Sequence, residues 1–241
     1  MEKGLAHDRR WMLTDSDNEF MSQRLYPKMA LFKLQIQDSA FKISCGQDSL
    51  LLSFTPSVIR SIDSSIAAKI WDDEVEVHEV SKEYSEWFSE RLAMDCKLVA
   101  FPENNLRPVD AGYKINDEQV SLADAYPFLI IGEQSLADLN ARLNVQVPMN
   151  RFRPNFVFDG GRPYEEDCWK KFSVGKNKFI AVKPCARCVL TTINQDTGEK
   201  GVEPLATLSK YRKKENKVLF GQNVLAVSHY EIHEGDEIIL E

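Results

Sequence analysis

The chain has 241 residues, of which 43% are hydrophobic and 28% are charged, as in an ordinary globular protein with one large or two small domains. Its net charge of −7 argues against a protein that binds nucleic acid or a membrane surface. The five cysteines are odd in number and irregularly spaced, which is typical of a reducing compartment. Because no signal peptide or long apolar run is visible, we expect a cytoplasmic protein with no membrane partner.

Short strands separated by turn signals dominate the first part of the chain. We expect a hairpin whose tip is Asp72-Asp73-Glu74, and a helix over 81–92, where aromatic and aliphatic residues recur at the helical period. The expected strands cover residues 30–36, 40–45, 49–54, 66–71 and 75–80.

The second half predicts two more helices before it returns to strands. Ser135 opens the helix expected over 135–143 in a near capping box, and Pro204 takes the first position of a helix over 204–211. Gly221-Gln222-Asn223 is a turn signal. The expected strands cover 178–182, 188–193, 218–220, 224–227 and 237–240. We therefore predict a mainly β protein, a barrel or sandwich with a few helices.

The segment from Lys183 to Cys188 carries the strongest chemical signal, because two thiols and an arginine stand together in Cys185-Ala186-Arg187-Cys188. Cysteine is a soft metal ligand, and arginine is a fixed-charge donor suited to phosphate. The motif therefore predicts a site for a thiophilic metal beside an anionic cofactor.

Other interpretations of the two thiols remain open. Buried free cysteines are usually inert, and a zinc site would need a second cysteine pair, which this sequence lacks. A thioredoxin-type pair should open a helix, whereas the residues after Cys188 favour a strand. If the chain is extended from Cys185 onward, the two thiols point to opposite faces, and both reach one metal only if Pro184 to Ala186 form a turn. We expect one working thiol, Cys188.

Three further segments have both a functional and an ordinary interpretation. In 151–155, two arginines could clamp a phosphate while Asn155 reads a polar ring edge, or the segment is a solvated loop before an edge strand. In 7–11, the ordinary interpretation is a surface Asp–Arg ion pair with a solvent-exposed His7, and the alternatives are an arginine stacked on Trp11 and His7 as a catalytic base. The basic run 210–217 is either a solvated loop or a docking face for an acidic redox partner.

Taken in order, these segments resemble the MOSC-domain proteins of the mitochondrial amidoxime reducing component type and their bacterial relatives. The matches are specific as a series, since they follow one another along nearly the whole chain. They are Gly4–Met12, Ser22-Gln23-Arg24 with Pro27, Ser135–Asn140, Arg151–Asn155, Tyr164–Asp167 with Trp169, Cys185–Cys188, Thr191-Thr192, Asp196-Thr197-Gly198, Pro204-Leu205, Leu208 and Phe220-Gly221-Gln222.

The resemblance implies a small N-terminal β-barrel-like domain over residues 1–102, a MOSC β-barrel over 103–241, and molybdenum cofactor (Mo-molybdopterin) between them. Family members begin with an earlier strand and a segment whose Lys and Ser help to hold the cofactor phosphate. This sequence starts at Met1, directly before the Gly4–Met12 segment, so either its start was assigned too late, the chain was shortened, or the protein has lost that strand; in each case the resemblance predicts that cofactor affinity is affected.

By the same resemblance, Cys188 is the protein ligand of molybdenum and the catalytic residue. The residues implied in holding the cofactor are Arg9, Arg153 and Arg187, with Asn155 nearby and Ser135 as a further contact. For Ser135, a role as helix N-cap would explain its presence equally well.

The activity implied is a molybdenum-dependent oxidoreductase that removes oxygen from small N-hydroxylated compounds. No motif for flavin, haem, an iron–sulfur cluster or pyridoxal phosphate is visible, so a separate electron donor (a flavoprotein, a ferredoxin or a cytochrome b5-like protein) is expected. The alternatives are a carrier of molybdenum cofactor or sulfur without reductase turnover, and a β-barrel that binds nothing.

Overall fold

The computed structural model describes residues 3–54 and 65–241. The chain is divided into two compact units. Unit 1 contains the residues up to Ala6, then Pro108–Thr192 and Gly201–Glu241, and unit 2 contains His7–Arg107 and Ile193–Lys200. The chain therefore enters unit 2 twice.

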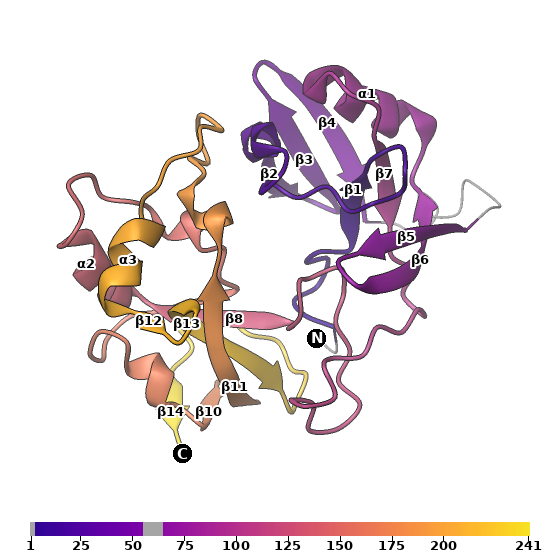
Figure 1. Ribbon diagram of the computed structural model, residues 1–241. Coiled ribbons are helices and arrows are strands. Elements are labelled where there is room, and N and C mark those ends of the chain that lie inside the picture. Colours follow the sequence, from indigo (N-terminus) through magenta and orange to yellow (C-terminus); the bar gives the residue numbers. More distant parts are fainter. Residues whose placement is uncertain (1–2, 55–64) are drawn as a thin grey trace. The chain divides into compact units, whose positions relative to one another are not determined.

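The described residues of unit 2 form two antiparallel sheets, one α-helix and one 3-10 helix (Figure 1). The strand order is β1-β7-β6-β5 in one sheet and β2-β3-β4 in the other. The elements are β1 (Trp11–Thr14), a 3-10 helix (Pro27–Leu31), β2 (Lys33–Gln37), β3 (Ala40–Cys45), β4 (Asp48–Ser53), β5 (Ile66–Ile70), β6 (Asp73–Glu79), α1 (Lys82–Leu92) and β7 (Lys97–Ala100).

The core of unit 2 lies under α1, which buries Phe88 and Leu92 against residues of β1, β3 and β4. Ser81 caps the helix, since its Oγ accepts the N–H of Tyr84. The predicted helix and the predicted hairpin are confirmed, but the tip of the hairpin is Trp71-Asp72, because Asp73 and Glu74 already pair with β5. The strand expected from Ala30 begins only at Lys33, because Pro27 starts a 3-10 helix that includes Ala30.

Unit 1 is built on one large sheet of order β14-β10-β11-β13-β8-β9, with β12 paired to β13. All pairs are antiparallel except β8–β9. Figure 1 shows β11 and β13, the two long strands, running side by side. The elements are β8 (Phe128–Gly132), α2 (Glu133–Asn140), 3-10 helices at Met149–Arg151, Glu165–Cys168 and Val189–Thr192, β9 (Phe156–Phe158), β10 (Lys171–Val174), β11 (Asn177–Arg187), α3 (Leu205–Tyr211), β12 (Lys213–Lys214), β13 (Lys217–Ala226) and β14 (Ile238–Leu240).

Apolar residues cover both faces of this sheet. Phe128 and Phe179 belong to the cluster on one face, and Leu139 of α2 and Leu208 of α3 belong to a second cluster with Phe220. Strands outweigh the three α-helices of the described residues, so the predicted mainly β fold class is confirmed. Within the same part of the chain, no helix combines the length and the apolar character needed to cross a bilayer.

The strand predicted over 188–193 is wrong. β11 ends at Arg187, and Val189–Thr192 form a 3-10 helix. The hydroxyl of Thr191 donates to the Cys188 carbonyl and that of Thr192 to the Val189 carbonyl. Such local bonds offer the backbone an alternative to a sheet ladder, which overrides the β propensity of the residue types.

Two other local predictions fail. Gly221-Gln222-Asn223 is not a turn, because β13 continues through it. Ser135 is not the N-cap of α2, which begins at Glu133 after Gly132. In both cases the polar or flexible residue lies inside an element, and tertiary contacts decide its conformation.

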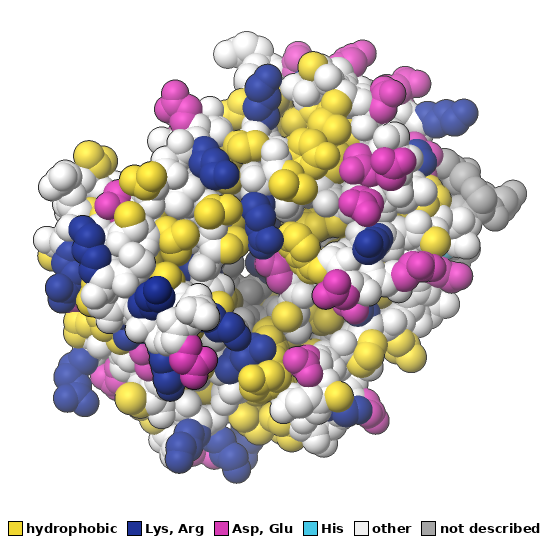
Figure 2. Space-filling model, viewed as in Figure 1, with side chains coloured by type: hydrophobic (Ala, Val, Ile, Leu, Met, Phe, Trp, Pro, Cys, Tyr) yellow, Lys and Arg dark blue, Asp and Glu magenta, His cyan; other side chains and the backbone are white. Residues whose placement is uncertain are grey.

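The surface carries both signs of charge. In the view of Figure 2, Lys and Arg side chains are interspersed with Asp and Glu rather than gathered in one block. This distribution matches a charge of −7 spread over 30 basic and 37 acidic residues.

Candidate functional site

The end of β11 places the cysteine–arginine motif. Cys185 and Arg187 alternate to the same face of the strand, and Arg187 Nη1 donates to Cys185 Sγ at 2.9 Å. Residues 184–186 therefore do not form the turn that would bring both thiols to one metal. Cys188 follows the strand directly.

The guanidinium of Arg187 is held from two sides. Nη1 is bonded to Cys185, and Nη2 donates to the carbonyl of Phe152 at 2.6 Å. Nε is buried and has no hydrogen-bond partner among the residues of the two described ranges. Because an unpaired buried N–H costs about 1–3 kcal/mol, this donor is one that an anionic or carbonyl-bearing ligand would satisfy.

The turn after Cys188 meets the arginine-rich segment. The Cys188 carbonyl accepts both the N–H and the hydroxyl of Thr191, and Arg151 Nη1 lies 3.4 Å from the Thr191 carbonyl. Together with the bond from Arg187 to Phe152, these contacts bring residues 151–155 against the Cys188 turn. The structure thus joins two motifs that lie more than thirty residues apart in the sequence.

Arg153 and Asn155 differ in their surroundings. Arg153 is exposed and has a left-handed φ of 55°, which is uncommon for a residue with a Cβ. Asn155 is paired with β8, because its Oδ1 accepts the N–H of Leu129 and its own N–H donates to the Leu129 carbonyl. Asn155 therefore fixes the segment to the sheet, and Arg153 is an exposed residue of the same segment.

Ser135 is fully buried and its hydroxyl is used within the protein. Its Oγ lies 2.8 and 2.9 Å from the two carboxylate oxygens of Glu166 and accepts the N–H of Tyr164 at 2.7 Å. The same carboxylate accepts the N–H of Gly132. Burial raises the pKa of Glu166 above the usual value for a glutamate.

Glu166 was not singled out from the sequence, although it lies in a quoted segment. Beside it, the Tyr164 hydroxyl donates to Asp138 at 2.6 Å, and Arg142 binds the same carboxylate with two nitrogens. Only a signal linking Ser135 to a residue thirty-one positions later would have found this network.

Arg9 belongs to unit 2, where it has a left-handed φ of 50° and forms an ion pair with Asp8. The surface ion pair proposed from the sequence is therefore present. The Arg9 side chain is about three-quarters buried, with 24% of its surface exposed, so Arg9 is not a freely solvated arginine.

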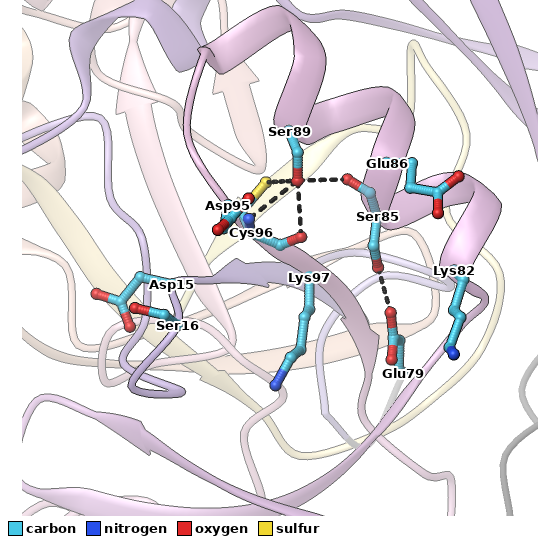
Figure 3. A pocket seen from close by; sticks show the side chains of 10 residues that line it. All are labelled: Asp15, Ser16, Glu79, Lys82, Ser85, Glu86, Ser89, Asp95, Cys96 and Lys97. Carbon is cyan, nitrogen blue, oxygen red and sulfur yellow. Dashed lines mark hydrogen bonds between the residues drawn. The ribbon is translucent and has the colours of Figure 1, made fainter.

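A cavity of about 300 Å³ lies elsewhere in unit 2, beside α1 (Figure 3). Among the residues that line the cavity, Figure 3 shows the hydroxyl of Ser85 hydrogen-bonded to Glu79 and that of Ser89 hydrogen-bonded to Cys96. None of the predicted site residues lines it. In the described ranges, no group of three or more His, Cys, Asp or Glu side chains is placed to hold a metal ion.

The chain belongs to the MOSC domain family. The MOSC domain matches residues 117–239, and the MOSC N-terminal beta barrel domain matches residues 1–95. These matches confirm the resemblance found in the sequence.

Two kinds of relative are similar to this chain. A protein named molybdenum cofactor sulfurase, from Oryza sativa subsp. japonica, is 32% identical over 97% of the chain, which spans 30% of that protein. Mitochondrial amidoxime-reducing component 1 is 34% identical in Mus musculus, over 87% of the chain and 62% of that protein. The Homo sapiens protein of that name is 31% identical over 100% of the chain and 74% of its own length.

Proposed function

We propose that this protein binds molybdenum cofactor and reduces N-hydroxylated compounds. Family membership and the relatives named amidoxime-reducing component support the proposal. The observation that carries it is the guanidinium of Arg187, which is fixed beside Cys188 with one buried N–H unused.

The residues at the end of β11 fit such a cofactor. Cys188 would supply a single thiolate, which suits a metal whose other soft ligands come from the dithiolene of the cofactor. Arg187 would donate through Nε, and Arg153 and Asn155 would complete the pocket for phosphate and pterin. Arg9 is proposed from its motif, and Ser135 would act through Glu166 and the Tyr164 backbone. When bound, the cofactor supplies two-electron redox chemistry.

The overall reaction is R–NHOH + 2 e⁻ + 2 H⁺ → R–NH₂ + H₂O, so the N–O bond breaks and the oxygen leaves as water. The electrons come from a separate donor protein. The part of this chain is to present the thiolate of Cys188 from a turn that two threonine hydroxyls stabilise, and to hold Arg187 in one orientation. Because the Cys185 sulfur accepts a hydrogen bond from Arg187, Cys185 would orient the arginine rather than bind the metal.

A second candidate function is a carrier of molybdenum cofactor or sulfur without reductase turnover. It is favoured by the similarity of 97% of the chain to part of a molybdenum cofactor sulfurase. Both functions use the same cofactor site, and they differ in whether electrons pass to a substrate.

The test is molybdenum per chain, measured by elemental analysis on protein from a cofactor-competent host, followed by reduction of benzamidoxime with an artificial electron donor. One metal per chain with turnover supports the reductase. One metal without turnover, also with hydroxylaminopurine as substrate, favours the carrier. A metal content near zero in the full chain would contradict the reductase and the carrier of molybdenum cofactor.

A further inference from the structure

Gln222 lies in the middle of β13 and is 4% exposed. Its neighbours in register are Pro184 on β11 and Ile130 on β8. Its side-chain Oε1 is buried without a hydrogen-bond partner among the residues that the structure describes. A glutamine is thus held in the centre of the sheet, where no described residue pairs with its acceptor oxygen.

The strand neighbours explain why no partner is found. Ile130 has an apolar side chain, and Pro184 has no N–H to offer. Leaving a buried amide oxygen unpaired costs about 1–3 kcal/mol, and most buried polar groups in folded proteins are paired. An aliphatic residue would avoid this cost at the same place. An acceptor left unpaired by the described residues is one that the N–H of a bound ligand would satisfy.

A bulge in β13 selects the face to which Gln222 points. Leu219 is paired with Ala186, whereas Gln222 is paired with Pro184, so β13 has one residue more than β11 between these pairs. Without the extra residue, Gln222 would lie on the opposite face. With it, Gln222 shares the face of Pro184 and Ala186.

The same alternation relates this face to the proposed metal ligand. Residues 184 and 186 share one face of β11, whereas Cys185 and Arg187 lie on the other face, and Cys188 follows two positions after 186, just beyond the end of the strand. Gln222, opposite Pro184, and Arg187, at the end of β11, therefore lie on opposite faces of the sheet. Each has one buried polar atom without a partner.

We propose that Gln222 is a recognition residue for the pterin of the cofactor, which rests on the proposed function. A side-chain amide presents a donor and an acceptor side by side, and it can pair with a planar ring edge that offers the complementary acceptor and donor. The pterin edge, with its ring N–H, amino and carbonyl groups, has this pattern. Gln222 would bind and orient the ring and take no part in electron or proton transfer.

The experiment compares Gln222→Met with Gln146→Met, a control at an exposed glutamine of the same unit. Each variant of the full chain is made with and without a supply of cofactor. Thermal unfolding is measured on the cofactor-free form, and molybdenum and pterin are measured on the supplied form. Gln222→Leu serves as the second variant if the Met variant does not fold.

We expect cofactor-free Gln222→Met to unfold at the same temperature as the wild type or higher, because an unsatisfied amide has been removed. We expect its cofactor content after gel filtration to fall about tenfold or more, as loss of a buried hydrogen-bonded contact predicts. The Gln146→Met control should match the wild type in both measurements.

Two results would overturn the inference alone. One is a Gln222→Met protein that retains the wild-type cofactor content. The other is a cofactor-free variant that unfolds at a clearly lower temperature, which would show that the amide is satisfied by a buried water and has a structural role. A wild-type chain that holds no cofactor would instead contradict the proposed function, and this inference with it.

Discussion

Arg187 shows how neighbouring atoms fix a charged side chain before a ligand arrives. Two of its nitrogens are bonded to Cys185 and Phe152, so little conformational entropy remains to be lost on binding. A group held in one orientation binds more tightly than a mobile one of the same chemistry. The two cysteines of the motif should consequently differ in what they contribute.

Replacement of each cysteine by alanine tests that difference. We expect Cys188→Ala to lose nearly all bound molybdenum, because it removes the proposed ligand. Cys185→Ala should retain a reduced but measurable amount, because Arg187 keeps its bond to Phe152. Molybdenum per chain is the measurement, with Cys168→Ala, at an exposed cysteine, as the control. Equal losses in the first two variants would contradict a single ligand.

Ser135 should matter for stability. Ser135→Ala removes a donor to the buried Glu166 carboxylate and the acceptor of the Tyr164 N–H. We expect the free energy of unfolding in urea to fall by about 1–3 kcal/mol, the cost of leaving buried polar groups unpaired. Ser209→Ala, which removes only a bond to a carbonyl three residues earlier, should change it by about 0.5 kcal/mol or less. Similar values for the two variants would contradict the role given to the network.

The pKa of Glu166 predicts a pH dependence of stability. Burial raises this pKa in the folded state, so the folded protein binds more protons than the unfolded chain above the ordinary glutamate pKa of about 4.3. The stability from this group is complete below that pH and is lost as pH rises through the folded pKa. We expect the melting temperature of Glu166→Gln, relative to wild type, to rise from pH 4 to pH 8. A constant difference over that range would contradict the raised pKa.

At the scale of elements, Gly221 makes the bulge of β13 possible. Its φ is 81°, and a Cβ at this position would lie 2.6 Å from Ile131 Cγ1 and 3.0 Å from the Ile130 carbonyl oxygen. Glycine is therefore required both by the backbone conformation and by the close approach of β8. The face to which Gln222 points depends on this one residue.

Gly221→Ala should destabilise unit 1 by about 3 kcal/mol or more, since a left-handed conformation and a clash with a packed strand are both imposed. Gly160→Ala is the matched control, because Gly160 has a φ of 85° with no atom within 4 Å of its Cβ position. It should cost about 1–2 kcal/mol, the strain of the backbone alone. Urea unfolding measures both, and equal costs would exclude the clash as a cause.

Local sequence signals predicted the elements whose stabilising contacts are local. The capping residue Ser81 and the spacing of Phe88 and Leu92 define α1, and the hairpin of β5 and β6 follows from its turn. The strand predicted from Cys188 fails because hydroxyl-to-carbonyl bonds compete with the sheet, which residue propensity does not include.

The same limit applies to the candidate site. The motif ending in Cys188 could be located from residue types alone. The partners of Ser135 and the surroundings of Gln222 could not, because Glu166 is 31 positions from Ser135, and Pro184 is remote from Gln222 in the sequence. Their effect depends on burial and register, which are fixed only when the strands pair.

At the scale of the whole molecule, each unit has its own apolar core, so we expect the two to unfold in separate transitions. Trp169 lies in unit 1, and the other three tryptophans (Trp11, Trp71 and Trp87) lie in unit 2. In Trp169→Phe, fluorescence reports unit 2 alone, and adding Gly221→Ala should leave its urea midpoint unchanged.

The complementary variant replaces the three tryptophans of unit 2 by phenylalanine and reports unit 1 through Trp169. Here Gly221→Ala should lower the midpoint. Equal shifts in both backgrounds would show that the molecule unfolds as one cooperative body.

The short return of the chain into unit 2 has a consequence for biosynthesis. The side chain of Gln195 donates a hydrogen bond to Gln23, and Asp196 forms a salt bridge with Lys33. Residues 193–200 therefore complete a unit whose other residues end at Arg107. During translation, the N-terminal part must wait for nearly a hundred further residues before its last segment leaves the ribosome. At about 5–20 residues per second this delay is on the order of 5–20 seconds. A gene fragment that stops near residue 107 would therefore encode an incomplete unit, exposed to aggregation and proteolysis in the cell.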